Sequence, residues 1–163
     1  MKNTKGEVYL GIDPGIADTG FGVIEKNGAE LHCLAYGSIK TSKNDKIEDR
    51  LKIIYSDLTY LLKKYQPVCA SVEQLFFTNN AKTAIVVGEA RGVILLTIAQ
   101  ANVPIREFTP LQVKQAVSTY GKADKGQVQR MVKMLLKLDI IPKPDDAADA
   151  LAIAICAATS FKA

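Results

Sequence analysis

The sequence is poor in the residues that bind zinc and in those that build disulfide frameworks. It holds one histidine, His32, and three cysteines, Cys33, Cys69 and Cys156, which are widely spaced and form no CxxC pair. Zinc sites are built from several His and Cys ligands, so we expect none here. An odd number of cysteines in apolar surroundings predicts reduced core thiols in a cytosolic protein.

Long apolar runs and a strong charge bias are also missing. The polar start, Met1 to Glu7, contains no apolar signal segment. The most apolar helix that we expect, around Ile94 to Ala99, is interrupted by Glu89 and Arg91 and should be too short to span a bilayer. We therefore predict a cytoplasmic protein without a membrane partner. The net charge of +4 permits a nucleic-acid partner without requiring one.

What is present fits a single α/β domain over residues 1–163. Of these residues 48% are hydrophobic, enough for a sizeable core, and no repeat or linker interrupts the chain. Hydrophobic periodicity and turn residues predict strands over 8–13, 20–26, 30–39, 68–74 and 104–108. They predict helices from 47 to before Pro67, over 80–102, from Pro110, from Asp124 to Leu138, and over 146–160.

The expected element order is βββαβαβααα. Asn27-Gly28 is a strong hairpin signal, so the first three strands should form an antiparallel meander. The later strands arrive through helical crossovers, which produce parallel pairings. The sequence therefore predicts a mixed five-stranded sheet flanked by helices.

Four acids stand where apolar sequence predicts burial. Asp13 ends the apolar strand in "YLGIDPG", and Glu73 ends another in "CASVEQLFF". Asp146 and Asp149 lie on one face at the start of the apolar helix in "PDDAADALAIAI". Buried carboxylates are costly unless they are paired, and strand ends and a helix start can meet at one sheet edge. Oxygen ligands without His or Cys point to magnesium or manganese.

Each acid also has a simpler interpretation. The Asp-Pro-Gly motif at 13–15 is a common turn sequence, and Glu73 could be a solvated strand end. Asp146 or Asp149 could favour the helix dipole, and Asp145 is expected to cap the same helix. These interpretations explain each acid singly, but explain poorly why four acids each interrupt an apolar segment.

Three glycines near the first strand allow two interpretations. Gly15, Gly20 and Gly22 leave the backbone uncrowded, which suits the close approach of a phosphate. Turn geometry and strand packing are the alternative, which we favour for Gly22.

Five segments of the sequence together resemble those of a known family. The segments "GIDPGIADTGFGVIE", "SVEQLFFTNNAKTAIVVGEARG", "QVKQAV", "KADKGQVQRMV" and "DDAADALAIAI" are similar to those of RuvC, the bacterial Holliday-junction resolvases. The resemblance runs from Tyr9 to about Ala158. It implies a ribonuclease-H-like fold, a homodimer, and symmetric, magnesium-dependent nicking of four-way DNA junctions during recombination and repair. It also implies branch-migration motor proteins as partners.

The resemblance assigns roles to residues of this chain. The family's catalytic, metal-binding acids fall on Asp13, Glu73, Asp146 and Asp149. Two family lysines with roles in catalysis and DNA binding fall on Lys114 and Lys125. Two magnesium ions, which manganese can replace, would activate a water and stabilise the phosphate and the leaving 3′ oxygen.

Two adjacent aromatics follow Glu73 in "LFFTNN". The family's junction-inserting phenylalanine falls on Phe76, and Phe77 is the second candidate. In a strand one ring would point into the core, and the other could wedge between bases at an opened junction. The next helix carries Gly88 and Gly92, which permit close helix approach either to the sheet or to a second subunit. A two-fold dimer suits a junction with two equivalent strands to cut.

Three other functions compete with junction resolution. The resolvase-like enzyme that trims ribosomal RNA precursors opens with a similar "GIDPG" turn, but it would not be expected to carry "VEQLFF". An actin-like phosphotransferase needs a second domain and a second glycine-rich loop, which this sequence lacks. A junction-binding protein with a dead site is disfavoured because all four acids are present.

Overall fold

The computed structural model describes residues 6–74, 80–118 and 121–160. Its element order matches the predicted one. The strands are β1 (Glu7–Asp13), β2 (Asp18–Asn27), β3 (Glu30–Lys40), β4 (Cys69–Glu73) and β5 (Ile105–Phe108). The helices are α1 (Ile47–Tyr65), α2 (Ala81–Gln100), α3 (Pro110–Val117), α4 (Lys125–Leu135) and α5 (Asp145–Ser160).

The strands form one mixed sheet in the order β3-β2-β1-β4-β5. β1, β2 and β3 pair antiparallel, whereas β1 with β4 and β4 with β5 pair parallel, as the crossovers predict. Asn27 still pairs with Glu30, so the hairpin loop is Gly28 and Ala29, one residue later than the Asn-Gly signal suggests. Gly28 takes a φ of 62°, which glycine adopts without strain.

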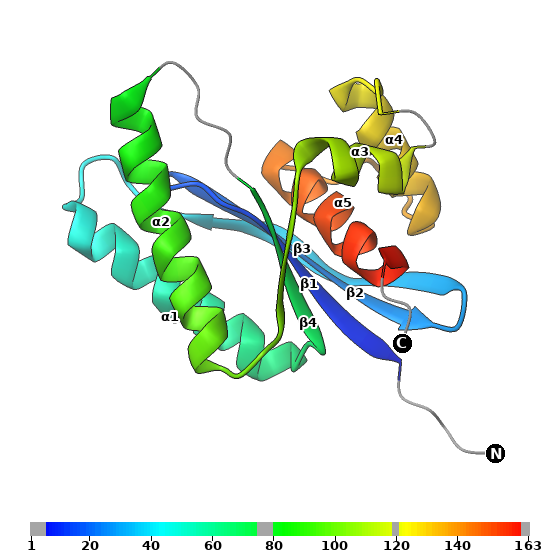
Figure 1. Ribbon diagram of the computed structural model, residues 1–163, viewed down its shortest axis with the longest axis horizontal. Helices are drawn as coiled ribbons and strands as arrows, with labels where there is room; N and C mark the ends of the chain where they lie inside the picture. The colour runs from blue at the N-terminus through cyan, green and yellow to red at the C-terminus, as the bar shows by residue number, and fades with distance from the viewer. Residues whose placement is uncertain (1–5, 75–79, 119–120, 161–163) are drawn as a thin grey trace.

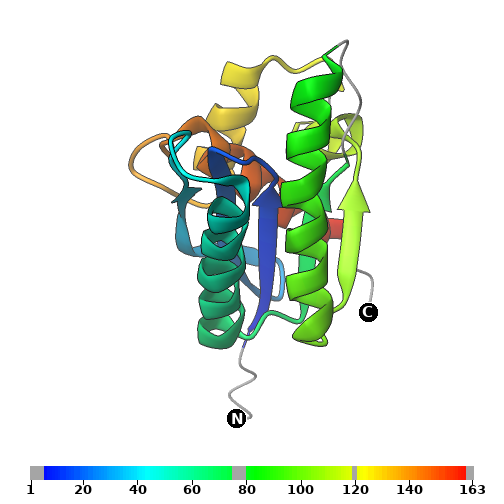
Figure 2. The ribbon, with the colours of Figure 1, turned by 90° about the vertical axis from the view of Figure 1, so that its left-hand side faces the viewer.

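Helices cover both faces of the sheet (Figure 1). α1 and α2 lie side by side on one face (Figure 2), where they pack on Leu10 and Ile12 of β1. α3, α4 and α5 cover the other face, where Tyr9 joins their core. Successive strand residues point to opposite faces. Asp13 therefore shares the α5 face with Tyr9.

α5 lies close to the sheet because the residues that meet there, on the helix and on the strands, have small side chains or none. All its residues from Ala147 to Ala158 are buried except Asp149, and most of them are alanine. A Cβ on Gly11 would overlap the carbonyl oxygen of Ala150, and one on Gly22 would lie 2.7 Å from the nitrogen of Leu151. These glycines let the helix backbone rest directly on β1 and β2.

The same contact corrects one interpretation of the glycines. A Cβ on Gly20 would overlap the carbonyl oxygen of Asp146, and one on Gly15 would overlap that of Asp18. The space beside Gly20 is filled by α5, and the space beside Gly15 by its own turn. Helix seating and turn geometry, rather than phosphate approach, account for both positions.

Capping signals locate α3 and α4 well. Thr109 with Gln112 and Asp124 with Gln127 both form reciprocal capping boxes. α4 ends at Leu135, earlier than the predicted Leu138, in a turn in which Lys137 takes a φ of 52°. Cys69 and Cys156 are buried free thiols, whereas Cys33 is a free thiol that is only partly buried, at the edge of the core in which we expected it.

α2 is the one helix among the described residues that is long and apolar enough to cross a membrane by length and composition alone. Our expectation that it is too short is therefore wrong: it has 20 residues. A single helix of this kind is weak evidence for a membrane, because core helices pass the same test. Only 22% of its most apolar window is buried, so the outward face of α2 is apolar and exposed.

Candidate active site

Two acids lie at the ends of neighbouring parallel strands. Asp13 closes β1 and Glu73 closes β4, and the last register pair before them joins Ile12 to Val72. The carboxyl ends of parallel strands meet at one sheet edge, where α/β proteins commonly bind ligands. Ser71, two residues before Glu73, donates to the Ile153 carbonyl of α5 at 3.2 Å, so Glu73 faces α5. Asp13, on the same face of β1 as Tyr9, faces α5 as well.

α5 brings the other two acids to the same edge. Asp146 and Asp149 lie in its first turns, three residues apart and hence on one face. β2 pairs Gly20 with Asp13, and the backbone of Asp146 rests on that glycine. One carboxylate oxygen from each of Asp13, Asp146 and Asp149 lies within 4.8 Å of the others. Three oxygens so placed can hold a divalent metal ion.

The protein leaves the negative charge of this group largely uncompensated. Burial, and then the charges of Glu73, Asp149 and Asp146, raises the pKa of Asp13 to about 8. Burial and the Asp149 charge raise the pKa of Glu73, and Lys114 opposes that rise. Burial also raises the pKa of Asp149, against the effect of Lys125. Charges held together at this cost favour the binding of a cation.

A pocket of about 270 Å³ joins the acids to the two predicted lysines. Glu73 and Asp149 line it together with Lys114 from α3 and Lys125 from α4. Its remaining wall is mostly apolar and consists of Pro110, Val113, Val128 and Ala152. The structure therefore brings all four predicted acids and both predicted lysines to one place. Phe76 and Phe77 lie outside the described residues.

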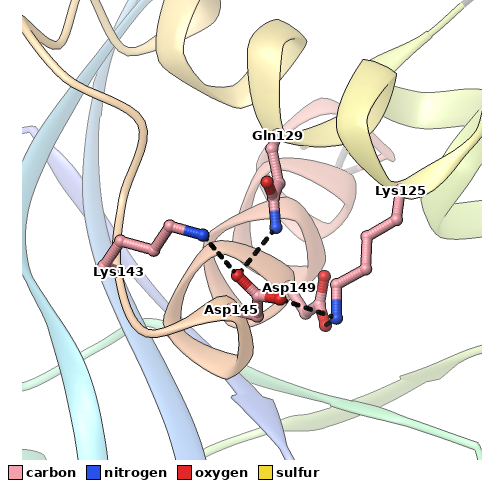
Figure 3. Close-up of polar contacts among 5 residues, drawn as sticks. All are labelled: Lys125, Gln129, Lys143, Asp145 and Asp149. Carbon is pink, nitrogen blue, oxygen red and sulfur yellow. Dashed lines mark hydrogen bonds and ion pairs between the residues drawn. The ribbon is translucent and has the colours of Figure 1, made fainter.

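Asp145, which we expected to cap α5, does something else. It is the first residue of α5, and its carboxylate reaches Lys125, Gln129 and Lys143 (Figure 3). Hydrogen bonds from Lys143 and Lys125 lower the pKa of Asp145 to about 2. Lys125 also lies 3.7 Å from Asp149. Burial alone would lower the pKa of Lys125, but the charges of Asp149 and Asp145 outweigh it and raise that pKa.

Sequence reasoning missed this group of contacts. Gln129 and Lys143 carry no motif of their own, and Asp145 adjoins the acidic pair without belonging to its spacing. The available signal was the four-residue step from Lys125 to Gln129, which places both side chains on one face of α4.

Comparison with known proteins agrees with this geometry. The family model described as "Crossover junction endodeoxyribonuclease RuvC" matches residues 9–157. Proteins of that description from Halothermothrix orenii and Caldicellulosiruptor saccharolyticus are each 57% identical to the chain. The alignments cover 95% and 90% of this chain and 94% and 89% of those relatives.

Solved structures give the same result. Thermus thermophilus RuvC in complex with a Holliday junction substrate superposes with a TM-score of 0.85 at 36% identity, over 93% of this chain and 92% of that one. The yeast mitochondrial Holliday junction resolvase Ydc2, at 16% identity and a TM-score of 0.67, shares the fold over 93% of this chain and 78% of its own. The chain therefore belongs to the RuvC family of crossover junction endodeoxyribonucleases and is a Holliday junction resolvase.

Proposed function

We propose that the four acids at the sheet edge are the catalytic metal ligands of this resolvase: Asp13, Glu73, Asp146 and Asp149. The observation that carries the proposal is the group of three aspartate oxygens within 4.8 Å, formed from β1 and α5. Glu73 lines the adjoining pocket and is coupled electrostatically to Asp13 and Asp149. Asp13, at the centre of the charge group, is the residue best placed to serve as a shared ligand.

An oxygen-only donor set fits magnesium, with manganese as a substitute. When bound, two such ions activate the attacking water and stabilise the phosphate and the leaving 3′ oxygen. The chain itself contributes rigidity, because the backbone of α5 rests on Gly11 and Gly20 and fixes the spacing of the carboxylates. Lys114 and Lys125 are placed to bind the scissile phosphate and offset its charge.

We further propose that two copies of the chain act as a dimer on the two equivalent strands of a four-way junction. An exposed stripe on α2 supports this assignment. Ile85 and Leu96 are 64% and 56% exposed, and a Cβ on Gly88 or Gly92 would meet nothing within 4 Å. These four residues lie on one helix face, which a second helix could approach closely.

The remaining assignments rest on family membership. We propose that Phe76, or its neighbour Phe77, inserts at the crossover, because the segment that carries both follows Glu73 at the sheet edge. Branch-migration motor proteins would deliver the junction in the cytoplasm. The whole chain, residues 1–163, would act as a single nuclease domain.

The proposal is tested by cutting a synthetic mobile four-way junction with and without magnesium. We expect Asp13→Asn, Glu73→Gln, Asp146→Asn and Asp149→Asn each to abolish cleavage while junction binding in EDTA persists, since no surface cation is removed. Asp57→Asn, an exposed acid on α1, is the matched control and should cut normally. Near-normal cutting by any of the four variants would remove that residue from the site.

A further inference from the structure

Asp145 adjoins the proposed ligand set without belonging to it. Its two carboxylate oxygens make different contacts. Oδ1 accepts hydrogen bonds from Lys143 Nζ at 2.8 Å and from Gln129 Nε2 at 3.1 Å. Oδ2 lies 3.3 Å from Lys125 Nζ. Each oxygen therefore has its own partners, and the group links the starts of α4 and α5 (Figure 3).

Lys125 stands between two carboxylates. Its ammonium lies 3.3 Å from Asp145 Oδ2 and 3.7 Å from Asp149 Oδ2. Asp149 belongs to the group of aspartates that can hold a metal ion, whereas Asp145 does not. An ammonium bound to Asp149 competes with a metal ion for the same carboxylate, and Asp145 offers it a nearer alternative.

We propose that Asp145 is a positioning residue that shares the Lys125 ammonium with Asp149 and so prevents a closer ion pair there, which leaves Asp149 freer to bind metal and keeps the ammonium at the pocket for the DNA phosphate. This inference rests on the roles proposed above for Lys125 and Asp149. It adds a residue that acts through Lys125 and touches neither metal nor substrate.

The neighbours of Asp145 fix the direction of its carboxylate. The side chain of Gln129 belongs to a buried residue of α4, one turn after Lys125, so its amide has little freedom. Lys143 approaches the same oxygen from the connection that precedes α5. With Oδ1 held by both donors, Oδ2 is left to face Lys125. Residues that orient a ligand or its partner commonly affect a metal site by 10–100-fold when they are changed.

The test is a double-mutant cycle read by metal binding in the absence of DNA. Manganese affinity of the purified protein is measured by calorimetry for wild type, Asp145→Asn, Lys125→Met and the double variant. We expect Asp145→Asn to weaken manganese binding about tenfold, because Lys125 then pairs with Asp149 alone. In the Lys125→Met background the same change should have no effect. Asp139→Asn, an exposed acid on the same α4–α5 connection, is the control and should bind normally.

Cleavage provides a second readout that a purely structural role would not move. At saturating junction, Asp145→Asn should raise the magnesium concentration needed for half-maximal single-turnover cutting. Lys143→Met keeps Asp145 but loses one orienting donor, so it should shift the requirement in the same direction by a smaller factor. It also serves as the test variant if Asp145→Asn does not fold, which thermal melting would reveal.

Three outcomes overturn the inference. Equal weakening of manganese binding with and without Lys125 would mean that the Asp145 charge acts directly on the metal. No weakening in either background would mean that Asp145 has no part in metal binding. A smaller metal requirement for Asp145→Asn would reverse the proposed direction. Failure of the ligand set is recognised separately, because Asp149→Asn would then bind manganese and cut normally.

Discussion

α2 and α5 are both apolar helices rich in small residues, yet the fold uses them in opposite ways. α5 is enclosed by its own chain, and its small residues meet the glycines of β1 and β2. α2 buries only Ala90, Ile94, Thr97 and Ile98, and the space beside its two glycines is open. Small residues on a helix therefore indicate close approach, but they do not tell which partner approaches.

The different packing of α2 and α5 also bears on function. Close packing of α5 on the sheet fixes Asp146 and Asp149 against Asp13, so its small residues set the geometry of the proposed metal site. α2 covers the opposite face of the sheet from α5 (Figure 1). The subunit contacts proposed for α2 would therefore not disturb the carboxylates.

The largest loss of stability and activity is expected from adding a side chain at Gly11, where the backbone of α5 packs on β1. In Gly11→Ala the new methyl group overlaps the Ala150 carbonyl and lies 2.5 Å from the Ala154 nitrogen, so backbone must move. We expect a loss of about 3 kcal/mol in the free energy of unfolding, at the upper end for overpacking, and loss of cleavage as the carboxylates shift. Urea unfolding and junction cutting measure both. A stable, active variant would show that α5 is not held by this contact.

A smaller effect on stability should come from pH, because burial, Glu73 and the acids of α5 raise the pKa of Asp13. The folded chain keeps a proton on Asp13 between the ordinary pKa of 3.8 and about 8, whereas the unfolded chain has lost it. The contribution of Asp13 to stability without metal should therefore fall as pH rises from 6 to 8, by at most about 1.4 kcal/mol per pH unit.

Thermal melting across this range checks the expectation for Asp13. Asp13→Asn should flatten the pH dependence, and magnesium should restore the stability of wild type at pH 8 because it binds the folded state. An equally steep decline in Asp13→Asn would assign the pH dependence to other groups.

The smallest change in the free energy of unfolding is expected from a substitution on α2, and it should be a gain in stability instead of a loss. Gly92→Ala places a methyl group in open space and replaces a poor helix former, so the monomer should gain about 1 kcal/mol. The same methyl group should weaken the proposed self-association, because it would separate the two α2 helices that are proposed to meet at Gly88 and Gly92. Urea unfolding at low protein concentration and sedimentation at high concentration measure the two effects. Destabilisation of the monomer would mean that this face already contacts its own chain.

Local sequence patterns predicted most of the fold. The apolar run of β1 and the apolar stripe of α1 are formed by residues close together in the sequence, and the capping boxes at Thr109 and Asp124 lie within four residues. Asp13 and Glu73 could be predicted as a pair because parallel strands end together. The family match then decided among the competing activities, and it favours the resolvase over the ribosomal RNA enzyme, the phosphotransferase and the inactive binder.

What could not be predicted depends on contacts between distant segments. Gly20 looked available for a phosphate because nothing nearby in sequence shows that Asp146 rests on it. Asp145 looked like a helix cap because its partners, Gln129 and Lys125, come from another helix. In both cases the local preference was reasonable, and the packing of α5 determined the outcome.

Because α5 follows all the other described elements, the order of synthesis should determine when the four acids can come together. Asp13 leaves the ribosome early, but Asp146 and Asp149 follow only after all the other elements of the described chain, roughly ten seconds later at about 5–20 residues per second. Until α5 emerges, the face of the sheet that it covers stays open. Before α5 emerges, a nascent chain therefore lacks two of the four proposed metal-binding acids and much of its core, and we expect no cleavage of nearby DNA until α5 docks.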